Sequence, residues 1–271
     1  MCFLLLWRLF YTKLYFKFIL MCNSHGHDTG VNRHQDIYAG AAHLLTQKNA
    51  KEINILQYGC SSGETTLAMA WKIYQQIIKK KLNTKLQILA LDICPEIINQ
   101  AKKGEYKIYC NESIKTQDFI QSIKNSPWFE IDNIASTVQA KWDIINKDIN
   151  IQYLQANADN WIVKSDKQFD CFEHLVCHNK QDKYTDIQKI KHKLKPNAYI
   201  LSKTMGLKNN NELELLNILE TEKDVQAIKF ITNIFSQLDL TEKNSIFNDF
   251  FTNTRLSILE YSIIYQVFVN K

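Results

Sequence analysis

The stretch from Ile53 to Ala70, INILQYGCSSGETTLAMA, decides the fold of this chain. Its first six residues are a mostly apolar run, typical of a short buried strand, and a helical pattern begins near Glu64. Gly59 and Gly63, two of only seven glycines in the chain, stand between these patterns. A glycine turn between a strand and a helix lets the backbone approach a ligand closely and presents free N–H groups. The stretch therefore predicts a nucleotide-binding turn.

Strands and helices alternate along the rest of the chain. Apolar spacing predicts helices over 35–50, from Glu64, from Pro95 to near Gly104, and through 187–194. Further predicted strands cover 86–93, 151–156, 169–176, 198–205 and, as a closing strand, 261–271. Such alternation favours an α/β fold with a mostly parallel sheet.

Two segments depart from this rhythm. Residues 108–150 are polar and aromatic, and we expect a helix followed by an insertion whose part near 130–150 forms a small β-subdomain. Trp128 and Phe129 would form the core of that insertion rather than a binding platform. The segment 206–250 is predicted to be helical. We therefore expect one domain over 23–271.

Composition is that of an ordinary globular protein of 271 residues, 45% hydrophobic and 23% charged. The net charge of +5 comes from basic residues interspersed with acids, so no nucleic-acid partner is expected. Seven cysteines without paired zinc spacing favour a reducing, cytoplasmic location and predict no metal site.

Residues 1–22 are apolar and aromatic, but Arg8, Lys13 and Lys17 interrupt them, which argues against a spanning helix. Two interpretations stay open for this leader. It is either a basic amphipathic segment that contacts a membrane surface, or translated upstream sequence before a start at Met21. Membrane contact is expected only through this leader.

The second strand ends in Asp92, whose carboxylate can accept both hydroxyls of a ribose. A full G-x-G-x-x-G motif and a Lys-Ser/Thr pair, which phosphate-binding turns need, are both missing. The turn therefore favours a cofactor that contains adenosine without phosphate, and S-adenosylmethionine fits this description.

The motif GCSSGETTLAMA (59–70) resembles that of the chemotaxis-receptor glutamate methyltransferases of the CheR type. The stretch LDICPEIINQAKKGEYK (91–107) is similar to their second motif, and HDTGVNR (27–33) to a segment with Thr and Arg four apart. The resemblance covers roughly 27–205. It implies a Rossmann-like class I methyltransferase fold, a seven-stranded sheet whose last strand is antiparallel, and S-adenosylmethionine as cofactor.

The resemblance also implies a set of cofactor contacts. Thr29 and Arg33 would close over the methionine end, Gly59 and Glu64 would contact the cofactor at the turn, Asp92 would hold the ribose, and Asn157 with Ala158 would border the adenine. No catalytic residue is assigned, because a carboxylate acceptor has no proton to remove and needs only in-line placement in a desolvated pocket.

The chain departs from the family where substrate is handled. Leu175 and Val176 stand at the family's Arg-Asn pair, and Asn197 with Ala198 replaces a Gly-Gly pair. The first hypothesis is an S-adenosylmethionine-dependent methyltransferase acting on a protein side-chain carboxylate. The alternatives are a methyltransferase of the same fold with a small-molecule acceptor, and a catalytically inactive cofactor-binding regulatory protein.

Two other clusters favour structural roles. Cys60 lies near a helix start that could activate a thiol, but a packing role is favoured. The stretch EHLVCH (173–178) carries metal-type side chains, but His174 and His178 share a face only on a helix, whereas the residues before them read as a strand.

Overall fold

The structure, a computed structural model, describes residues 35–107, 121–132, 137–157, 161, 164–175, 186, 189–205, 225–228 and 263–270. The helices are α2 (Gln35–Gln47), α3 (Glu64–Lys79), α4 (Pro95–Lys103) and α6 (Trp142–Asp148). The strands are β1 (Glu52–Tyr58), β2 (Lys85–Asp92), β3 (Glu105–Lys107), β4 (Phe129–Asp132), β5 (Thr137–Ala140), β6 (Ile149–Gln155), β7 (Phe169–His174), β8 (Leu194–Met205), β9 (Val225–Ile228) and β10 (Ile263–Asn270). None of the described helices combines the length and apolar character that a membrane crossing needs.

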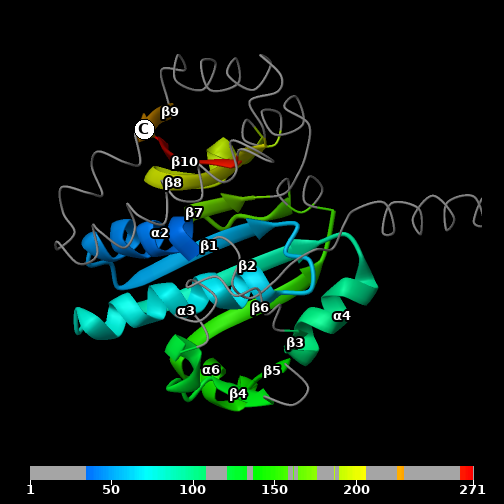
Figure 1. Cartoon of the computed structure of the whole chain (residues 1–271). Helices are drawn as coiled ribbons and strands as arrows, with labels where there is room; N and C mark the ends of the chain where they lie inside the picture. Colours follow the sequence, from blue (N-terminus) through cyan, green and yellow to red (C-terminus); the bar gives the residue numbers. More distant parts are fainter. Residues whose placement is uncertain are drawn as a thin grey trace, which may run out of the picture.

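The described strands form a central sheet of seven in the order β6-β2-β1-β7-β8-β10-β9 (Figure 1). Strands β6, β2, β1, β7 and β8 run parallel to one another. Strand β10 runs antiparallel to both β8 and β9, which confirms the antiparallel closing strand. Strand β1 has β2, the next strand of the chain, on one side, and β7, a much later strand, on its other side. The boundary between β1 and β7 is therefore a topological switch point.

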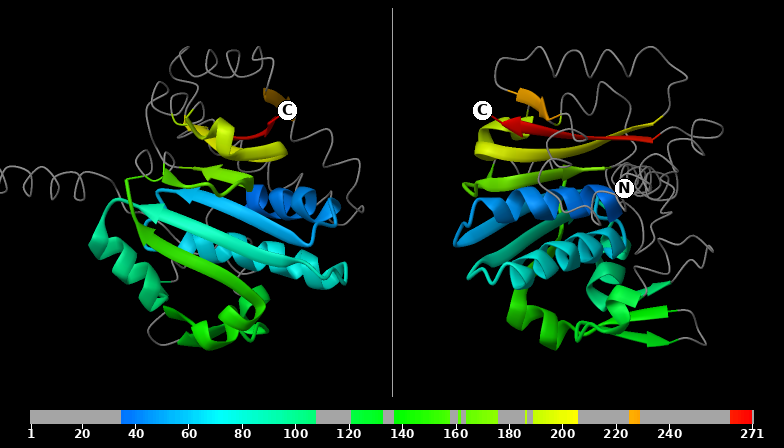
Figure 2. Two further views of the ribbon diagram at one scale, coloured as in Figure 1. Left: turned by 180° about the vertical axis from the view of Figure 1, so that it is seen from behind. Right: turned by 60° about the vertical axis from the view of Figure 1, so that its left-hand side comes forward.

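Both faces of the sheet are covered by apolar side chains. Helices α2, α3 and α4 lie on one face, where the stripe of α2 (Tyr38, Ala41, Leu45) packs with Leu67 of α3 and Ile55 of β1 (Figure 2). The opposite face buries Leu56, Leu91, Phe172, Ile190 and Ile200. Alternation along β1 thus supplies apolar residues to both layers, as expected for a strand inside a parallel sheet.

A three-stranded subdomain in the order β3-β5-β4 extends from the main domain. Trp128 anchors it, because its fully buried ring stacks on Tyr74 of α3 at 4.7 Å and lies 5.1 Å from Trp71. The indole Nε1 of Trp128 donates to Asp148 Oδ2 at 2.7 Å. Trp128 and Phe129 are core residues, as predicted, but the core they join is that of the main domain rather than a separate core of the insertion.

Three sequence predictions need correction. The insertion contains strands only up to Ala140, because residues 142–148 form helix α6, and its first strand, β3, starts earlier than expected. Residues 225–228, inside the segment predicted to be helical, form strand β9, because they pair with β10; the remainder of 206–250 lies outside the described residues. The helix predicted to reach Leu194 gives way to a 3-10 turn at Lys191–Lys193, because Leu194 already pairs with β7.

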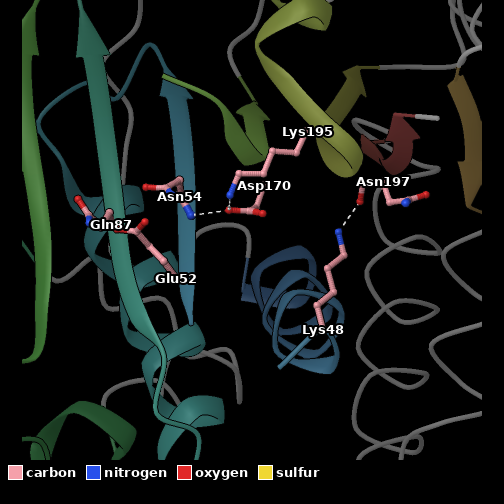
Figure 3. A network of polar contacts seen from close by, with 7 residues as sticks. All are labelled: Lys48, Glu52, Asn54, Gln87, Asp170, Lys195 and Asn197. Carbon is pink, nitrogen blue, oxygen red and sulfur yellow. Dashed lines mark hydrogen bonds and ion pairs between the residues drawn. The ribbon is translucent and has the colours of Figure 1, made fainter. Parts of the chain in front are cut away.

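A polar network holds the amino ends of the central strands together (Figure 3). Asp170 of β7 accepts a hydrogen bond from the Asn54 N–H of β1 at 2.9 Å and pairs with Lys195 of β8 at 2.8 Å. Lys48, just after α2, donates to the Asn197 carbonyl and lies 4.4 Å from the ring centre of Tyr199. Three strands and one helix are therefore joined at this edge by side-chain contacts.

Candidate functional site

The glycine turn links the carboxyl end of β1 to α3. Gly59 is exposed with φ of 63°, and Gly63 is the N-cap of α3 with φ of 90°. A Cβ on Gly63 would lie 2.8 Å from the Tyr153 hydroxyl oxygen and 2.9 Å from Ala101 Cβ. Both the positive φ and this close packing require glycine at Gly63. The start of α3 is thus drawn tightly against α4 and β6.

Asp92, at the end of β2, ties the turn to the next loop. Its Oδ2 accepts a hydrogen bond from the Ser61 N–H, and its Oδ1 accepts one from the Cys94 N–H, both at 3.0 Å. Cys94 is the N-cap of α4, so Asp92 bonds to the backbone before the helix rather than to the helix itself. Its half-buried carboxylate lies at the carboxyl edge, where a parallel sheet binds its ligands.

Ser61 supplies an observation that suits a ligand in the turn. Its backbone has a positive φ of 52°, which is uncommon outside glycine. Its hydroxyl oxygen is buried and has no hydrogen-bond partner in the described part of the chain. Buried hydroxyls normally find partners, so this one fits a polar ligand against the turn. A cofactor with ribose hydroxyls and no phosphate suits these neutral donors and the Asp92 acceptor.

Glu64 occupies the first position of α3 and is only 6% exposed. Its Oε2 accepts a hydrogen bond of 2.6 Å from the Ser62 hydroxyl. A carboxylate is favourable at a helix N-terminus because of the helix dipole. This local role accounts for the residue, and the cofactor contact implied for Glu64 stays a prediction.

The loop that follows β6 lies at the same carboxyl edge of the sheet as Asp92. The Ala156 N–H donates to the Asp92 carbonyl at 3.0 Å, and the exposed Asn157 accepts from the Trp161 N–H through its own carbonyl. Gly59, Asp92 and Asn157 therefore come from three neighbouring loops at one edge. The other implied contacts, Thr29, Arg33 and Ala158, lie outside the described residues.

Cys60 is a packing residue of the turn. Its side chain is fully buried, and its N–H donates to the Leu91 carbonyl at 3.0 Å. Burial first, and then the negative charges of Asp92 and Glu173, raise the pKa of the Cys60 thiol well above its ordinary value. The thiol is therefore protonated at neutral pH, which agrees with the predicted packing role.

The end of β7 carries two side chains that the sequence analysis did not place in the cofactor site. Glu173 is buried and accepts a 3.0 Å hydrogen bond from the Tyr38 hydroxyl of α2. His174 is buried and forms a 2.8 Å Nε2–Oδ2 contact with Asp186. The partners lie 135 and 12 positions away along the chain. The sequence offered one signal, two adjacent polar residues, Glu173 and His174, at the end of a buried strand.

A metal site is not formed by the described part of the chain, where no three His, Cys, Asp or Glu side chains gather. His174 contacts Asp186 through its Nε2 atom. Cys177 and His178 of the EHLVCH stretch lie outside the described residues.

Comparison with known proteins gives a family match over most of this architecture. The profile of the CheR methyltransferase SAM-binding domain matches residues 32–215. A chemotaxis protein methyltransferase from Borreliella burgdorferi is 36% identical over 63 residues, which is 23% of this chain. This chain covers only 22% of the length of that relative.

Solved structures similar to this chain include methyltransferases. An O-methyltransferase from Bacillus cereus in complex with SAH has a TM-score of 0.46 and 13% identity, covering 93% of this chain and 86% of that one. The plantazolicin methyltransferase BpumL with SAH has a TM-score of 0.46 and 12% identity, and the match covers 93% of this chain and 89% of the BpumL chain.

Proposed function

Because the chain belongs to the CheR methyltransferase family, we propose that it is an S-adenosylmethionine-dependent methyltransferase (EC 2.1.1) that methylates a side-chain carboxylate on a protein. The observation that carries this proposal is the joining of two strand-to-helix loops by Asp92 at the carboxyl edge. That edge is where a sheet of this topology binds its ligand.

The residues of this chain would act by binding and orientation. Gly59 gives the backbone access to the adenosine part, Asp92 accepts the ribose hydroxyls, and Asn157 with Ala158 borders the adenine. Thr29 and Arg33 close over the methionine end, where a guanidinium attracts the cofactor carboxylate. The cofactor supplies an activated methyl group on a sulfonium. A carboxylate acceptor is already deprotonated, so the chain must align it and exclude water.

The β3-β5-β4 subdomain is the proposed docking element for a protein acceptor. In the related enzymes such a piece docks the protein substrate by strand addition, and β3 and β4 are the outer strands here. Its attachment through Trp128, Tyr74 and Trp71 gives the docked segment a fixed position relative to α3. A cytoplasmic location, and membrane contact only through residues 1–22, belong to the same proposal.

One observation supports a non-catalytic alternative. Leu175, at the position of the family's Arg-Asn pair, is buried in the main core and offers no polar group to an acceptor. A protein that binds the cofactor and transfers no methyl group would serve as a regulatory module. A small-molecule acceptor is the other alternative.

Radiolabelled methyl transfer separates these functions. The purified full chain is incubated with S-adenosyl-[methyl-³H]methionine and a panel of carboxylate-rich proteins and small acids, and base-labile label identifies methyl esters. Label on protein supports the proposed function, and label on small acids supports the second candidate. Cofactor binding by calorimetric titration with no label on any acceptor would favour the regulatory module. The absence of cofactor binding would overturn all three.

A further inference from the structure

Tyr153 of β6 supports the glycine turn from within the protein. Its side chain is buried, and its hydroxyl donates to the Gly63 carbonyl at 3.3 Å. The same carbonyl accepts the Leu67 N–H at 3.0 Å, and the Gly63 N–H donates to the Cys60 carbonyl at 3.1 Å. A carbonyl oxygen has two lone pairs, so two donors saturate it. The last residue of the turn is thus fixed by three hydrogen bonds, one of which comes from a side chain.

The packing of Tyr153 does not require a hydroxyl. The side chain belongs to a buried cluster whose other members are Cys60, Ala90, Ile98 and Ala101. Among such neighbours a phenylalanine ring would fill nearly the same space. Burial, and then the neighbouring Tyr106 phenol, raise the pKa of Tyr153 well above its ordinary value. The hydroxyl therefore keeps its proton and remains a donor at neutral pH. Its hydrogen bond to the turn is the specific contribution of this tyrosine.

Tyr153 is separate from the groups that would meet the cofactor. Gly59, at the start of the turn, is exposed, and Asp92 is half-buried at the carboxyl edge. Tyr153 is 8% exposed and lies behind Gly63, where a Cβ on that glycine would come within 2.8 Å of the hydroxyl oxygen. The side chain is therefore placed to act on a ligand through the backbone of the turn rather than by direct contact.

The same cluster reaches the root of the β3-β5-β4 subdomain. The ring of Trp142, which begins α6 shortly after β5, lies edge-to-face with Tyr153 at 6.0 Å. The Tyr106 hydroxyl of β3 donates to the Ala101 carbonyl at 3.3 Å, and a Cβ on Gly63 would lie 2.9 Å from Ala101 Cβ. Tyr153 and Ala101 thus lie between the turn and the subdomain that is proposed to dock the acceptor.

We propose that Tyr153 is a positioning residue for methyl transfer, whose hydroxyl holds the turn through the Gly63 carbonyl in the place that receives the cofactor. The proposal rests on the cofactor-binding role of the turn. A turn that is already fixed loses little conformational freedom when a ligand binds, so this hydrogen bond raises affinity without touching the ligand. It also fixes the methyl donor relative to the subdomain, and small misplacements are costly for transfer.

Two phenylalanine substitutions give a matched test. Tyr153→Phe and Tyr106→Phe each remove a buried hydroxyl that donates to a backbone carbonyl at 3.3 Å, and only the first acceptor belongs to the turn. Calorimetric titration of the full chain with S-adenosylhomocysteine measures the effect. Tyr153→Phe is expected to bind about fivefold more weakly than wild type, the effect of one net hydrogen bond. Tyr106→Phe keeps the Tyr153 hydroxyl and is expected to bind within about twofold of wild type.

Thermal unfolding of both variants separates positioning from stability. A purely structural hydroxyl would give similar losses of unfolding temperature and equal affinities, whereas positioning gives similar temperatures and unequal affinities. Unchanged affinity in Tyr153→Phe would overturn the proposal, and so would equal losses of affinity in the two variants. Failure of Tyr153→Phe to fold would also overturn it, because the hydroxyl would then serve the fold as a whole. Failure of the wild type to bind S-adenosylhomocysteine would instead overturn the cofactor site itself.

Discussion

The two edges of the parallel strands use carboxylates in different ways. At the amino edge, Asp170 is neutralised by Lys195 and also accepts a backbone N–H (Figure 3). At the carboxyl edge, Asp92 accepts hydrogen bonds from two backbone N–H groups, and Glu173 accepts one from the Tyr38 hydroxyl. A lysine brings an opposite charge to the carboxylate of Asp170, whereas the two backbone N–H groups bonded to Asp92 are neutral donors. The amino edge is therefore built for stability, and the carboxyl edge for a ligand.

The largest expected effect on stability comes from two glycines, Gly63 and Gly104, that both have a positive φ and closely packed surroundings. Gly63→Ala and Gly104→Ala would each place a side chain at positive φ, with Cβ contacts of 2.8 Å and 2.6 Å respectively. Each is expected to lower the free energy of unfolding by about 3 kcal/mol, from left-handed backbone strain plus overpacking. Denaturant titration measures both losses.

The comparison between the edges predicts that only Gly63→Ala also affects the site. In the folded fraction, it should weaken S-adenosylhomocysteine binding at least about tenfold, because the turn must shift away from Tyr153. Gly104 lies beside the β-subdomain, next to Ala140 and Trp142, so its variant should bind normally. Equal losses of affinity would show that the turn has no special part in binding.

At the amino edge, Asp170→Ala should affect stability alone. It removes the acceptor of the Asn54 N–H and the carboxylate that pairs with Lys195, which is expected to cost about 2 kcal/mol after allowance for the partial exposure of Lys195. Thermal unfolding measures the loss, and Lys195→Met is the matched variant. A changed cofactor affinity in the folded protein would contradict the division between the edges.

At the carboxyl edge, Asp92→Ala should affect both properties. Charge-assisted hydrogen bonds to ribose are worth about 1.5–3 kcal/mol each, so binding of S-adenosylhomocysteine should weaken at least about tenfold. Loss of the acceptor for the Ser61 and Cys94 N–H groups adds about 1 kcal/mol of destabilisation. Calorimetric titration decides, and unaltered affinity in the folded variant would remove Asp92 from the cofactor site.

The main architecture was predictable from local patterns. Strands β1 and β2 and helices α3 and α4 carry apolar periodicity and are bounded by Gly63, Pro95 and Gly104. The structure places every end that was predicted for them within one residue. The closing strand alternates clearly enough to be found from its sequence. Residues 225–228 were misassigned because their strand is defined by pairing with β10, a contact with distant sequence.

The site was predictable only where a residue's role is local. Gly59 and Asp92 follow strands directly, so their edge is known once the strands are known. The double role of Asp92 needed three-dimensional information, because Ser61 lies 31 positions away. The Tyr38–Glu173 bond joins parts of the chain 135 positions apart, and no local pattern specifies that pairing.

The smallest expected effect lies away from both edges, at Asp148. This residue accepts a hydrogen bond from Trp128, whose ring stacks on Tyr74. Burial, and then hydrogen bonding to Asp148, raise the pKa of Tyr74 to about 12. Asp148→Asn keeps an acceptor for the Trp128 Nε1 but removes the charge, so it should cost about 1 kcal/mol and leave cofactor affinity unchanged. The pKa of Tyr74 should fall but stay above 10, because burial is its larger cause.

The contribution of Tyr74 to stability depends on pH in a definite direction. A tyrosine whose folded pKa is raised stabilises the protein fully below pH 10, and this contribution is lost as pH rises towards about 12, because the unfolded chain releases its proton first. Denaturant titrations at pH 9 and pH 11 should therefore show a smaller loss in Tyr74→Phe than in wild type. Absorbance of tyrosinate near 295 nm, compared with Tyr74→Phe, assigns the titration. A Tyr74 that titrates near 10 in wild type would mean that the subdomain is not packed on α3, and the fixed docking position proposed for it would fail with it.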